Sequence, residues 1–416
     1  MSTRVVVIGS GAREHALVRT LRLGGGEREI VAIPGNPGIA AEARCVEPRA
    51  AGIEALAAAA LGESPDLVVV GPEAPLADGF ADRIAAEGVP CFGPRKAAAR
   101  IEASKAFAKD VMAAAGVATA GSAVFSELEA ARAHARAKGA CVVKLDGLAA
   151  GKGVIVCDDG AQAAAAAGEL FRPGAQLLIE DRLEGPELSV IALCDGEHLL
   201  PLPPARDHKR LEDGDRGPNT GGMGAFSPPP DAPPELVEQI VRTVLQPVAR
   251  ELARRGAPFI GALYAGMMLT PKGPRVLEFN CRLGDPEAQA ILLRLRSDPL
   301  PLFLACAQGR LASQKPAWDP RTSVAVVLAS HGYPDKPRAG DVIEGLDRVE
   351  EGDDLWVLHA GTRLREGKLV TGGGRVLTVA ALGSGPAQAR MRAYAAAAHL
   401  HFPGMQLRRD IAAKEA

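Results

Sequence analysis

The chain has 416 residues, of which 47% are hydrophobic and 24% are charged, and its 48 basic and 50 acidic side chains give a formal net charge of −2. This length exceeds what one hydrophobic core usually organises, so about two to four domains are expected. The near-neutral charge provides no broad basic field for a phosphate backbone, which excludes nucleic acid as an expected partner.

The first hundred residues predict a parallel α/β domain. Short apolar runs, each followed by Gly or Pro, alternate with helical stretches, of which residues 15–23 are the first. Such β-branched runs are typical of buried parallel strands. The runs are residues 5–8, 29–33, 67–70 and 89–92. We expect a doubly wound domain over residues 1–103, and one helix over residues 97–115 that ends at Gly116.

Residues 119–193 predict a small α+β module around a glycine loop. Its expected strands are residues 141–145, 154–157 and 177–180, and its expected helix is residues 161–170. A polar passage rich in Gly and Pro follows at residues 201–234. It is too long and irregular for a simple connection, so it is either a disordered linker or a functional loop.

Two further units complete the chain. A helix at residues 236–255 and strands at residues 262–269 and 275–282 belong to a central unit. A fresh set of strands after Pro316 predicts a separate C-terminal domain. Its expected elements are strands at residues 324–329, 355–359 and 376–380 and a helix at residues 386–399.

Glycines follow the first strand, where a dinucleotide-binding fingerprint would lie. Gly9 and Gly11 leave backbone N–H groups free to hold an anion. A dinucleotide site needs a third glycine where Glu14 stands, and an acidic residue at the end of the second strand, where Ile33 stands. A phosphate site is therefore favoured over NAD binding, and a tight structural turn is the alternative.

A second glycine loop joins two predicted strands between Lys144 and Gly153. It holds three glycines and two lysines, but it lacks the GxxxxGK(S/T) spacing and leads into a strand, so it is not a Walker A loop. A lid that folds over nucleotide phosphates is favoured over an ordinary hairpin with solvated lysines.

The strand at residues 275–282 carries the sharpest pattern. A side-chain period of two places Leu277, Phe279 and Cys281 on one face, and Glu278, Asn280 and Arg282 on the other. Carboxylate and amide oxygens suit Mg²⁺, which keeps waters and bridges substrate phosphates. A half-exposed strand with a surface Glu/Arg pair is the alternative interpretation.

The spacing of the cysteines and the length of the apolar runs indicate where in the cell the protein is found. The seven cysteines form no CxxC pair, so neither a disulfide framework nor a zinc site is expected, and a cytoplasmic location fits. No run has the length of a membrane span or the form of a signal peptide, so no membrane partner is expected.

Several motifs, taken in chain order, resemble those of the glycinamide ribonucleotide synthetase family. They are GSGAREHAL, GPEAPL, SKAFAKD, KLDGLAAGKGVIV, the DHKR and GPNTGGMGAFSP passage, and LEFNCRLGDPEAQ. The resemblance continues through HAGT, TGGGRVL and GMQLRRDI, so it extends from Val5 to Asp410. The GPNTGGMGAFSP and EFNCRLGDPE segments are the most specific.

The resemblance implies an α/β ATP-grasp fold and an ATP-dependent ligase of purine biosynthesis. Glycine and 5-phosphoribosylamine would be the substrates, ATP the cosubstrate, and Mg²⁺ or Mn²⁺ the metal ion, in a monomeric enzyme. The implied units are a preATP-grasp domain at 1–103, a connecting helix at 104–118, a lid subdomain at 119–193, a central subdomain at 194–318 and a C-terminal domain at 319–416.

The resemblance also implies roles for individual residues. Lys105 and Lys144 would contact the ATP phosphates under the glycine loop, Glu180 and the backbone near Leu183 would contact adenine, and Glu187 the ribose. The loop residues in this set are Gly147, Gly151, Lys152 and Gly153. Phosphoribosylamine would face Gly9, Gly11, Arg13 and Glu73. Glu278 and Asn280 would hold the metal ion, and Asp207, Lys209, Arg282 and Asp285 would surround glycine and the acyl phosphate.

Three other functions compete with this interpretation. A different ATP-grasp ligase or carboxylase would share the nucleotide motifs and differ around the acceptor. A dehydrogenase built on the first domain is disfavoured by Glu14 and Ile33. A nucleotide sensor without turnover is disfavoured by the pairing of Glu278 with Asn280.

Overall fold

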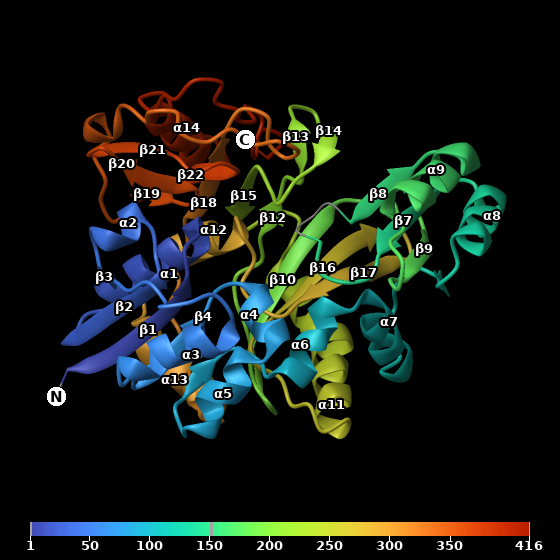
Figure 1. Cartoon of the computed structure of the whole chain (residues 1–416), viewed down its shortest axis with the longest axis horizontal. Helices are drawn as coiled ribbons and strands as arrows, with labels where there is room; N and C mark the ends of the chain where they lie inside the picture. The colour runs from blue at the N-terminus through green and yellow to red at the C-terminus, as the bar shows by residue number, and fades with distance from the viewer. Residues whose placement is uncertain (1, 150–152, 416) are drawn as a thin grey trace.

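The N-terminal domain is a five-stranded parallel sheet with helices on both faces. The computed structural model describes residues 2–149 and 153–415 (Figure 1). The strand order is β3-β2-β1-β4-β5, all parallel, as the first apolar runs predicted. The strands are β1 (Thr3–Gly9), β2 (Arg28–Pro34), β3 (Arg44–Cys45), β4 (Leu67–Val70) and β5 (Cys91–Phe92). The helices are α1 (Ala12–Leu23), α2 (Pro37–Ala40), α3 (Ile53–Gly62), α4 (Glu73–Asp78) and α5 (Phe80–Ala86).

This strand order positions a ligand crevice. The chain leaves β1 toward β2 on one side, and β4 lies on the other side, so the strand order reverses next to β1. Ligands of open α/β sheets bind outside the carboxyl ends of strands at such a switch point. The glycine loop after β1 and the start of α4 after β4 therefore face the same crevice.

Two helices, not one, connect this domain to the next. The predicted helix at residues 97–115 divides into α6 (Lys96–Ala103) and α7 (Lys105–Ala114). Ser104 has an extended backbone between them, and its side chain accepts a hydrogen bond from the amide of Phe107, which caps α7. The apolar periodicity continued through the break, so it could not reveal it.

The lid unit is a four-stranded antiparallel sheet of order β6-β9-β7-β8. Its strands are β6 (Ser122–Phe125), β7 (Cys141–Leu145), β8 (Val154–Cys157) and β9 (Leu177–Asp181), and its helices are α8 (Leu128–Lys138) and α9 (Gly160–Leu170). The sequence reading omitted β6 and α8. Buried alanines such as Ala131, Ala135 and Ala163 let both helices pack closely on the sheet.

The central sheet has the order β11-β10-β16-β17, with antiparallel pairing throughout. It consists of β10 (Glu187–Asp195), β11 (Leu199–Pro201), β16 (Ile260–Thr270) and β17 (Gly273–Asn280). All of β10 pairs with β16. The expected boundary at 193/194 falls inside β10, so we propose that the lid ends before Glu187. One long helix follows in three parts, α10 (Pro234–Ile240), a π-helical turn (Val241–Leu245) and α11 (Gln246–Arg254).

The passage at residues 201–234 is folded, so its interpretation as a disordered linker is wrong. It contains β12 (Arg206–Asp207), the hairpin of β13 (Arg210–Glu212) and β14 (Arg216–Asn219), and β15 (Gly224–Ser227). Strands β12 and β15 join the C-terminal sheet, whose order is β12-β15-β18-β22-β19. This sheet continues with β18 (Thr322–Ala329), β22 (Arg375–Gly383) and β19 (Leu355–His359).

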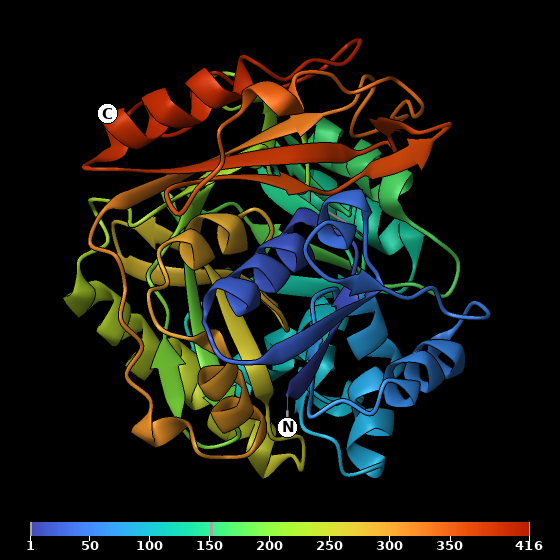
Figure 2. The same ribbon diagram turned by 90° about the vertical axis from the view of Figure 1, so that its left-hand side faces the viewer.

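The domains pack around shared helices. Figure 2 shows the C-terminal layer, with α14 (Pro386–Ala397), above the blue N-terminal domain. Residues of α12 (Glu287–Leu293) and α13 (Pro299–Ala307) share one buried cluster with residues of β1, β10 and β22. A small hairpin of β20 (Thr362–Arg365) and β21 (Lys368–Thr371) belongs to the C-terminal domain. Within residues 2–149 and 153–415, no helix combines the length and the apolar character that crossing a bilayer requires.

Candidate active site

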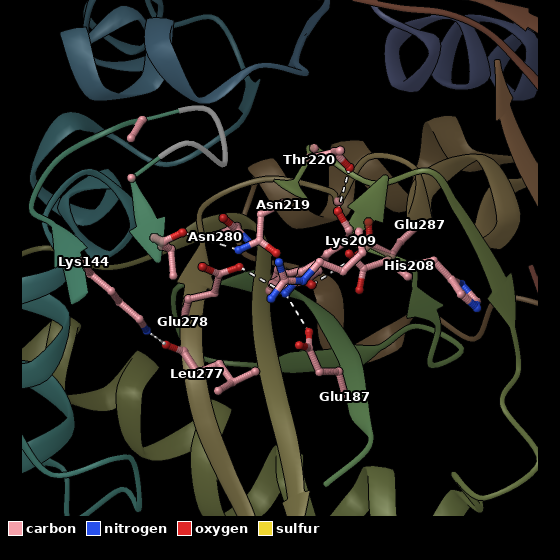
Figure 3. Close-up of a pocket in the computed structure, with 18 of the residues that line it drawn as sticks. Lys144, Glu187, His208, Lys209, Asn219, Thr220, Leu277, Glu278, Asn280 and Glu287 are labelled. Carbon is pink, nitrogen blue, oxygen red and sulfur yellow. Dashed lines mark hydrogen bonds and ion pairs between the residues drawn. The ribbon is translucent and has the colours of Figure 1, made fainter. Parts of the chain in front are cut away.

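A large cavity lies where the units meet. Its volume is about 1200 Å³, and side chains from the lid, the central sheet, the N-terminal domain and the C-terminal segment line it. Figure 3 shows part of it, with Lys144 on one side and Lys209 and Glu287 on the other. Charged residues therefore converge here from widely separated parts of the sequence.

Three lysines line the side of the cavity next to the lid, and two of them pair with Glu180. Lys144 Nζ lies 2.9 Å from Glu180 Oε2, and Lys109 Nζ lies 3.1 Å from Glu180 Oε1. Lys105 Nζ donates to the carbonyl of Gly147 at 2.8 Å. Burial lowers the pKa of both Lys105 and Lys109. This side of the cavity is suited to polyanionic phosphates.

A bulge in β17 changes the predicted alternation. Gly266 pairs with Glu278 but Met267 pairs with Val276, so Leu277 is an extra residue in the ladder. Val276 is buried in the core, whereas Leu277 is only partly buried, lies outside that core cluster and lines the cavity, so the expectation that Leu277 faces the core is wrong. Its carbonyl, freed from the ladder, accepts a hydrogen bond from Lys144 Nζ at 3.0 Å.

The central part of the cavity is acidic around one lysine. Lys209 Nζ lies 2.8 Å from Glu187 Oε2 and 3.6 Å from Glu278 Oε1 (Figure 3). Burial opposes the ionisation of Glu278, but Lys209 and Lys144 outweigh it and lower the pKa of that carboxyl. Burial and the neighbouring carboxylates raise the pKa of Asp207 to about 8, against the opposing effect of Lys209. The free protein therefore holds excess negative charge here, which a cationic ligand would neutralise.

The predicted metal site depends on oxygen atoms in the acidic part of the cavity. Glu278 and Asn280 both line the cavity from β17, and the ammonium of Lys209 near Glu278 provides positive charge in the free protein. Within the described part of the chain, no three His, Cys, Asp or Glu side chains are arranged to hold a metal ion. Two protein oxygens fit a Mg²⁺ ion that takes its other ligands from phosphates and water.

Arginines occupy the side of the cavity next to the N-terminal domain. Arg282 pairs with Glu73 at 3.2 Å and with Glu102 at 2.9 Å. Arg375 lies 3.2 Å from Asp285. A smaller cavity of about 280 Å³ adjoins this region and is lined by residues of both terminal domains. It is lined by Ser10, Gly11, Ala12, Asp285, Ala360, Gly361, Gly373, Arg375 and Thr378.

The glycine loop after β1 is already occupied by a carboxylate. Glu14 accepts a hydrogen bond from the amide of Gly11 at 2.6 Å and another from Arg13 Nε at 2.6 Å. A Cβ added to Gly9 would lie 2.6 Å from Cγ of Glu14, so that glycine makes room for this side chain. The amide of Gly11 is therefore not free, contrary to expectation.

Most residues expected in the site line the large cavity. Those that do are Lys105, Lys144, Gly147, Gly153, Glu180, Leu183, Glu187, Asp207, Lys209, Glu278, Asn280, Arg282, Asp285, Arg13 and Glu73. Gly11 lines the smaller cavity, and Gly9 lines neither of the two. Gly151 and Lys152 lie outside the described residues.

Sequence reasoning assigned no role to several lining residues. Lys109 was visible only as part of the motif SKAFAKD, and Asn219 and Thr220 only as part of GPNTGGMGAFSP. Glu287 was visible only as part of LEFNCRLGDPEAQ. Their motifs were the available signal, but the contacts depend on tertiary structure.

Comparisons with known proteins cover almost the whole chain. Three models describe the chain as phosphoribosylglycinamide synthetase: the N domain at residues 3–102, the ATP-grasp (A) domain at 103–288 and the C domain at 323–414. The phosphoribosylamine–glycine ligase of Streptomyces coelicolor is 51% identical over 99% of both chains. That of Allochromatium vinosum is 48% identical over 98% of this chain and 97% of its own.

Solved structures agree with these sequence comparisons. The phosphoribosylamine–glycine ligase of Thermotoga maritima superposes with a TM-score of 0.83 at 34% identity, over 98% of this chain and 100% of its own. A biotin carboxylase domain of Hydrogenobacter thermophilus, solved with MgADP and bicarbonate, superposes with a TM-score of 0.73 at 19% identity, over 98% of this chain and 92% of its own. The second likeness shows the fold alone.

Proposed function

The chain belongs to the phosphoribosylglycinamide synthetase family, and from this premise we propose how its large cavity performs the reaction. The chain is an ATP-dependent ligase with the ATP-grasp fold. It joins glycine to 5-phosphoribosylamine and gives glycinamide ribonucleotide in purine biosynthesis. The observation that carries the proposed site is the convergence of lysines, metal-binding oxygens and arginines on one cavity.

ATP binds between the lid sheet and the central sheet. Lys105 and Lys144 neutralise its phosphates, beside the cavity-lining residues Gly147 and Gly153. Glu180 and the backbone at Leu183 contact adenine, and Glu187 contacts the ribose. The support for this arrangement is that all these residues line the same cavity, with Lys144 and Glu180 already paired at 2.9 Å.

Glu278 and Asn280 hold the divalent metal ion that ATP-grasp chemistry uses. We propose Mg²⁺, with Mn²⁺ as a substitute, because both ions accept hard oxygen ligands. When bound, the ion neutralises charge that develops on the transferred phosphoryl group. The ammonium of Lys209, 3.6 Å from Glu278 and 2.8 Å from Glu187, would lie close to an ion held there.

The ligation needs an activated acyl group, because a carboxylate repels nucleophiles and lacks a leaving group. The carboxylate of glycine attacks the γ-phosphorus of ATP in line, and glycyl phosphate and ADP form. The amine of phosphoribosylamine then attacks the acyl carbon and expels phosphate. Asp207, Lys209, Arg282 and Asp285 surround the reacting groups, and the closed lid excludes water from the acyl phosphate.

Phosphoribosylamine lies on the side of the cavity next to the N-terminal domain. Arg13 and Glu73 face it in the large cavity, and its 5′-phosphate enters the crevice after β1 beside Gly9 and Gly11. Since Glu14 occupies the amide of Gly11, the phosphate relies on the remaining N–H groups at the start of α1 and on nearby guanidinium groups.

We also propose that the enzyme is a monomer and that it is located in the cytoplasm. Residues of one chain supply every wall of the large cavity, which supports a monomeric enzyme. All seven cysteines are free, which supports a reducing compartment.

The direct test measures ADP release with purified protein. Release should require ATP, glycine and freshly generated phosphoribosylamine together, and mass spectrometry should detect glycinamide ribonucleotide. Equal release when another amino acid or bicarbonate replaces glycine would reject the proposed acceptor site. Release without phosphoribosylamine would reject the ligation step.

A further inference from the structure

Glu287 is a buried carboxylate with a fixed orientation and no cationic partner. It begins α12, lines the large cavity and is 3% exposed. Its Oε1 accepts hydrogen bonds from Ser189 Oγ and Tyr264 Oη, each at 2.9 Å. Both donors are buried in the central sheet, on β10 and β16.

The two hydroxyls orient Glu287 without neutralising it. Each supplies a neutral O–H, so neither donor brings a positive charge to the carboxylate. Arg282 and Arg375 are close enough to interact with that charge, yet Arg282 pairs with Glu102 and Arg375 with Asp285. Across residues 2–149 and 153–415, no lysine, arginine or histidine forms an ion pair with Glu287. A buried charge without a counter-ion is costly, and here the cavity gives access for one.

The second oxygen of Glu287 is the free one. Its Oε2 accepts no hydrogen bond in the described part of the chain, and it lies against Gly284. A Cβ on Gly284 would approach Oε2 to 2.4 Å, so the glycine leaves the space that this oxygen occupies. This oxygen is therefore available to a small cation in the cavity.

We infer that Glu287, oriented by Ser189 and Tyr264, binds the ammonium group of the glycine substrate and sets the enzyme's requirement for an amino acid. The inference rests on the proposed function. Glycine presents one ammonium and one carboxylate, and only the carboxylate must reach the γ-phosphate of ATP. An ammonium held by Glu287 leaves the carboxylate free to turn toward the metal site at Glu278. A hydroxy acid such as glycolate lacks the positive charge and would leave Glu287 unpaired.

Glu287→Gln tests the inference because it keeps the shape and removes the charge. The KM for glycine should rise ~10-fold to ~100-fold, while the KM values for ATP and phosphoribosylamine stay within about twofold. Tyr264→Phe keeps the carboxylate but removes one orienting donor, so it should raise the KM for glycine by only ~3-fold. Glu180→Gln is the matched control, because the same change beside Lys144 should raise the KM for ATP instead.

Inhibition by glycolate tests whether Glu287 recognises the positive charge of glycine or has only a structural role. Glycolate should compete only weakly with glycine in the wild-type protein. In Glu287→Gln, the Ki of glycolate divided by the KM for glycine should be ~10-fold or more lower than in the wild type. An unchanged ratio, or a raised Mg²⁺ requirement with an unaltered KM for glycine, would overturn the inference. Circular dichroism checks folding, and Tyr264→Phe remains informative if Glu287→Gln does not fold. Failure of the proposed function would appear earlier, as wild-type protein that releases no ADP with glycine and phosphoribosylamine.

Discussion

Replacing Glu278 with Gln should remove most activity, because it neutralises a proposed metal ligand and keeps the shape of the side chain. The pKa of Glu278 is lowered despite burial, so the group is ionised at neutral pH and the change removes a full charge. Loss of one such electrostatic contact to a developing charge typically costs about 10²-fold to 10³-fold in rate, or ~3–4 kcal/mol. We expect kcat to fall ~10²-fold or more.

The same change should leave the protein folded. The side chain of Glu278 is partly exposed and its carboxylate lies 3.6 Å from Lys209, and partly exposed pairs of this kind contribute about 0–1 kcal/mol. Lys209 keeps its closer partner, Glu187, at 2.8 Å, so no cation is left unpaired. The free energy of unfolding should therefore change by no more than about 1 kcal/mol.

The assay is ADP release measured across a range of Mg²⁺ concentrations. Glu54→Gln is the control, because it makes the same chemical change in an ion pair with Arg83 at the surface. Activity of Glu278→Gln that recovers at high Mg²⁺ would agree with a weakened metal ligand. Wild-type turnover at limiting Mg²⁺ would refute the metal assignment, and a large loss of stability would refute the estimate of the ion pair.

Four further outcomes are expected. Arg13→Ala should raise the KM for phosphoribosylamine ~10-fold and leave ATP binding unchanged, and weakened ATP binding with unaltered phosphoribosylamine dependence would move this loop into the nucleotide site. Hydrogen exchange at residues 146–149 and 153 should slow when ATP and Mg²⁺ are added, whereas equal protection with and without them would indicate a fixed hairpin. The folded protein holds a proton on Asp207 up to about pH 8, whereas the unfolded chain releases it near pH 3.8. The free energy of unfolding should therefore fall as pH rises between these two values. Urea titrations at several pH values should show a smaller fall for Asp207→Asn. Burial lowers the pKa of His359 from 6.5 to about 3, so the free energy of unfolding should fall as pH falls between these two values. His359→Gln should reduce this fall. A dependence of unfolding free energy on pH that is the same in His359→Gln and the wild type would contradict the burial argument.

Apolar patterning predicted the sheets well because burial acts on runs of neighbouring residues. The apolar run at residues 67–70 is fully buried on both faces of the parallel sheet and coincides with β4. Strands β7 and β8 also have the predicted bounds, because their runs end at the glycine loop. Strand β6 was missed, since only half of its residues are even partly buried and the run is short.

Two local departures changed which atoms face the site. The bulge at Leu277 shifts the alternation in β17 by one residue, and it depends on pairing with β16 rather than on the composition of β17. In the first loop, the side chain at the third glycine position folds back, so Glu14 takes the amide of Gly11. Residue types indicated both regions, but hydrogen bonding decided their geometry.

The orientation of Glu287 lies beyond any local pattern. Its partners Tyr264 and Ser189 are 23 and 98 positions away, on two strands of the central sheet. A spacing rule compares residues within one element, where side chains three or four apart on a helix or two apart on a strand share a face. Here the central sheet brings Ser189 and Tyr264 within 2.9 Å of each other, and the chain that leaves β17 carries Glu287 over them at the start of α12. The sequence therefore shows an acidic residue close to the proposed metal-binding strand. It does not show whether that carboxylate is solvated or buried without a counter-ion, because this depends on how α12 packs on the central sheet.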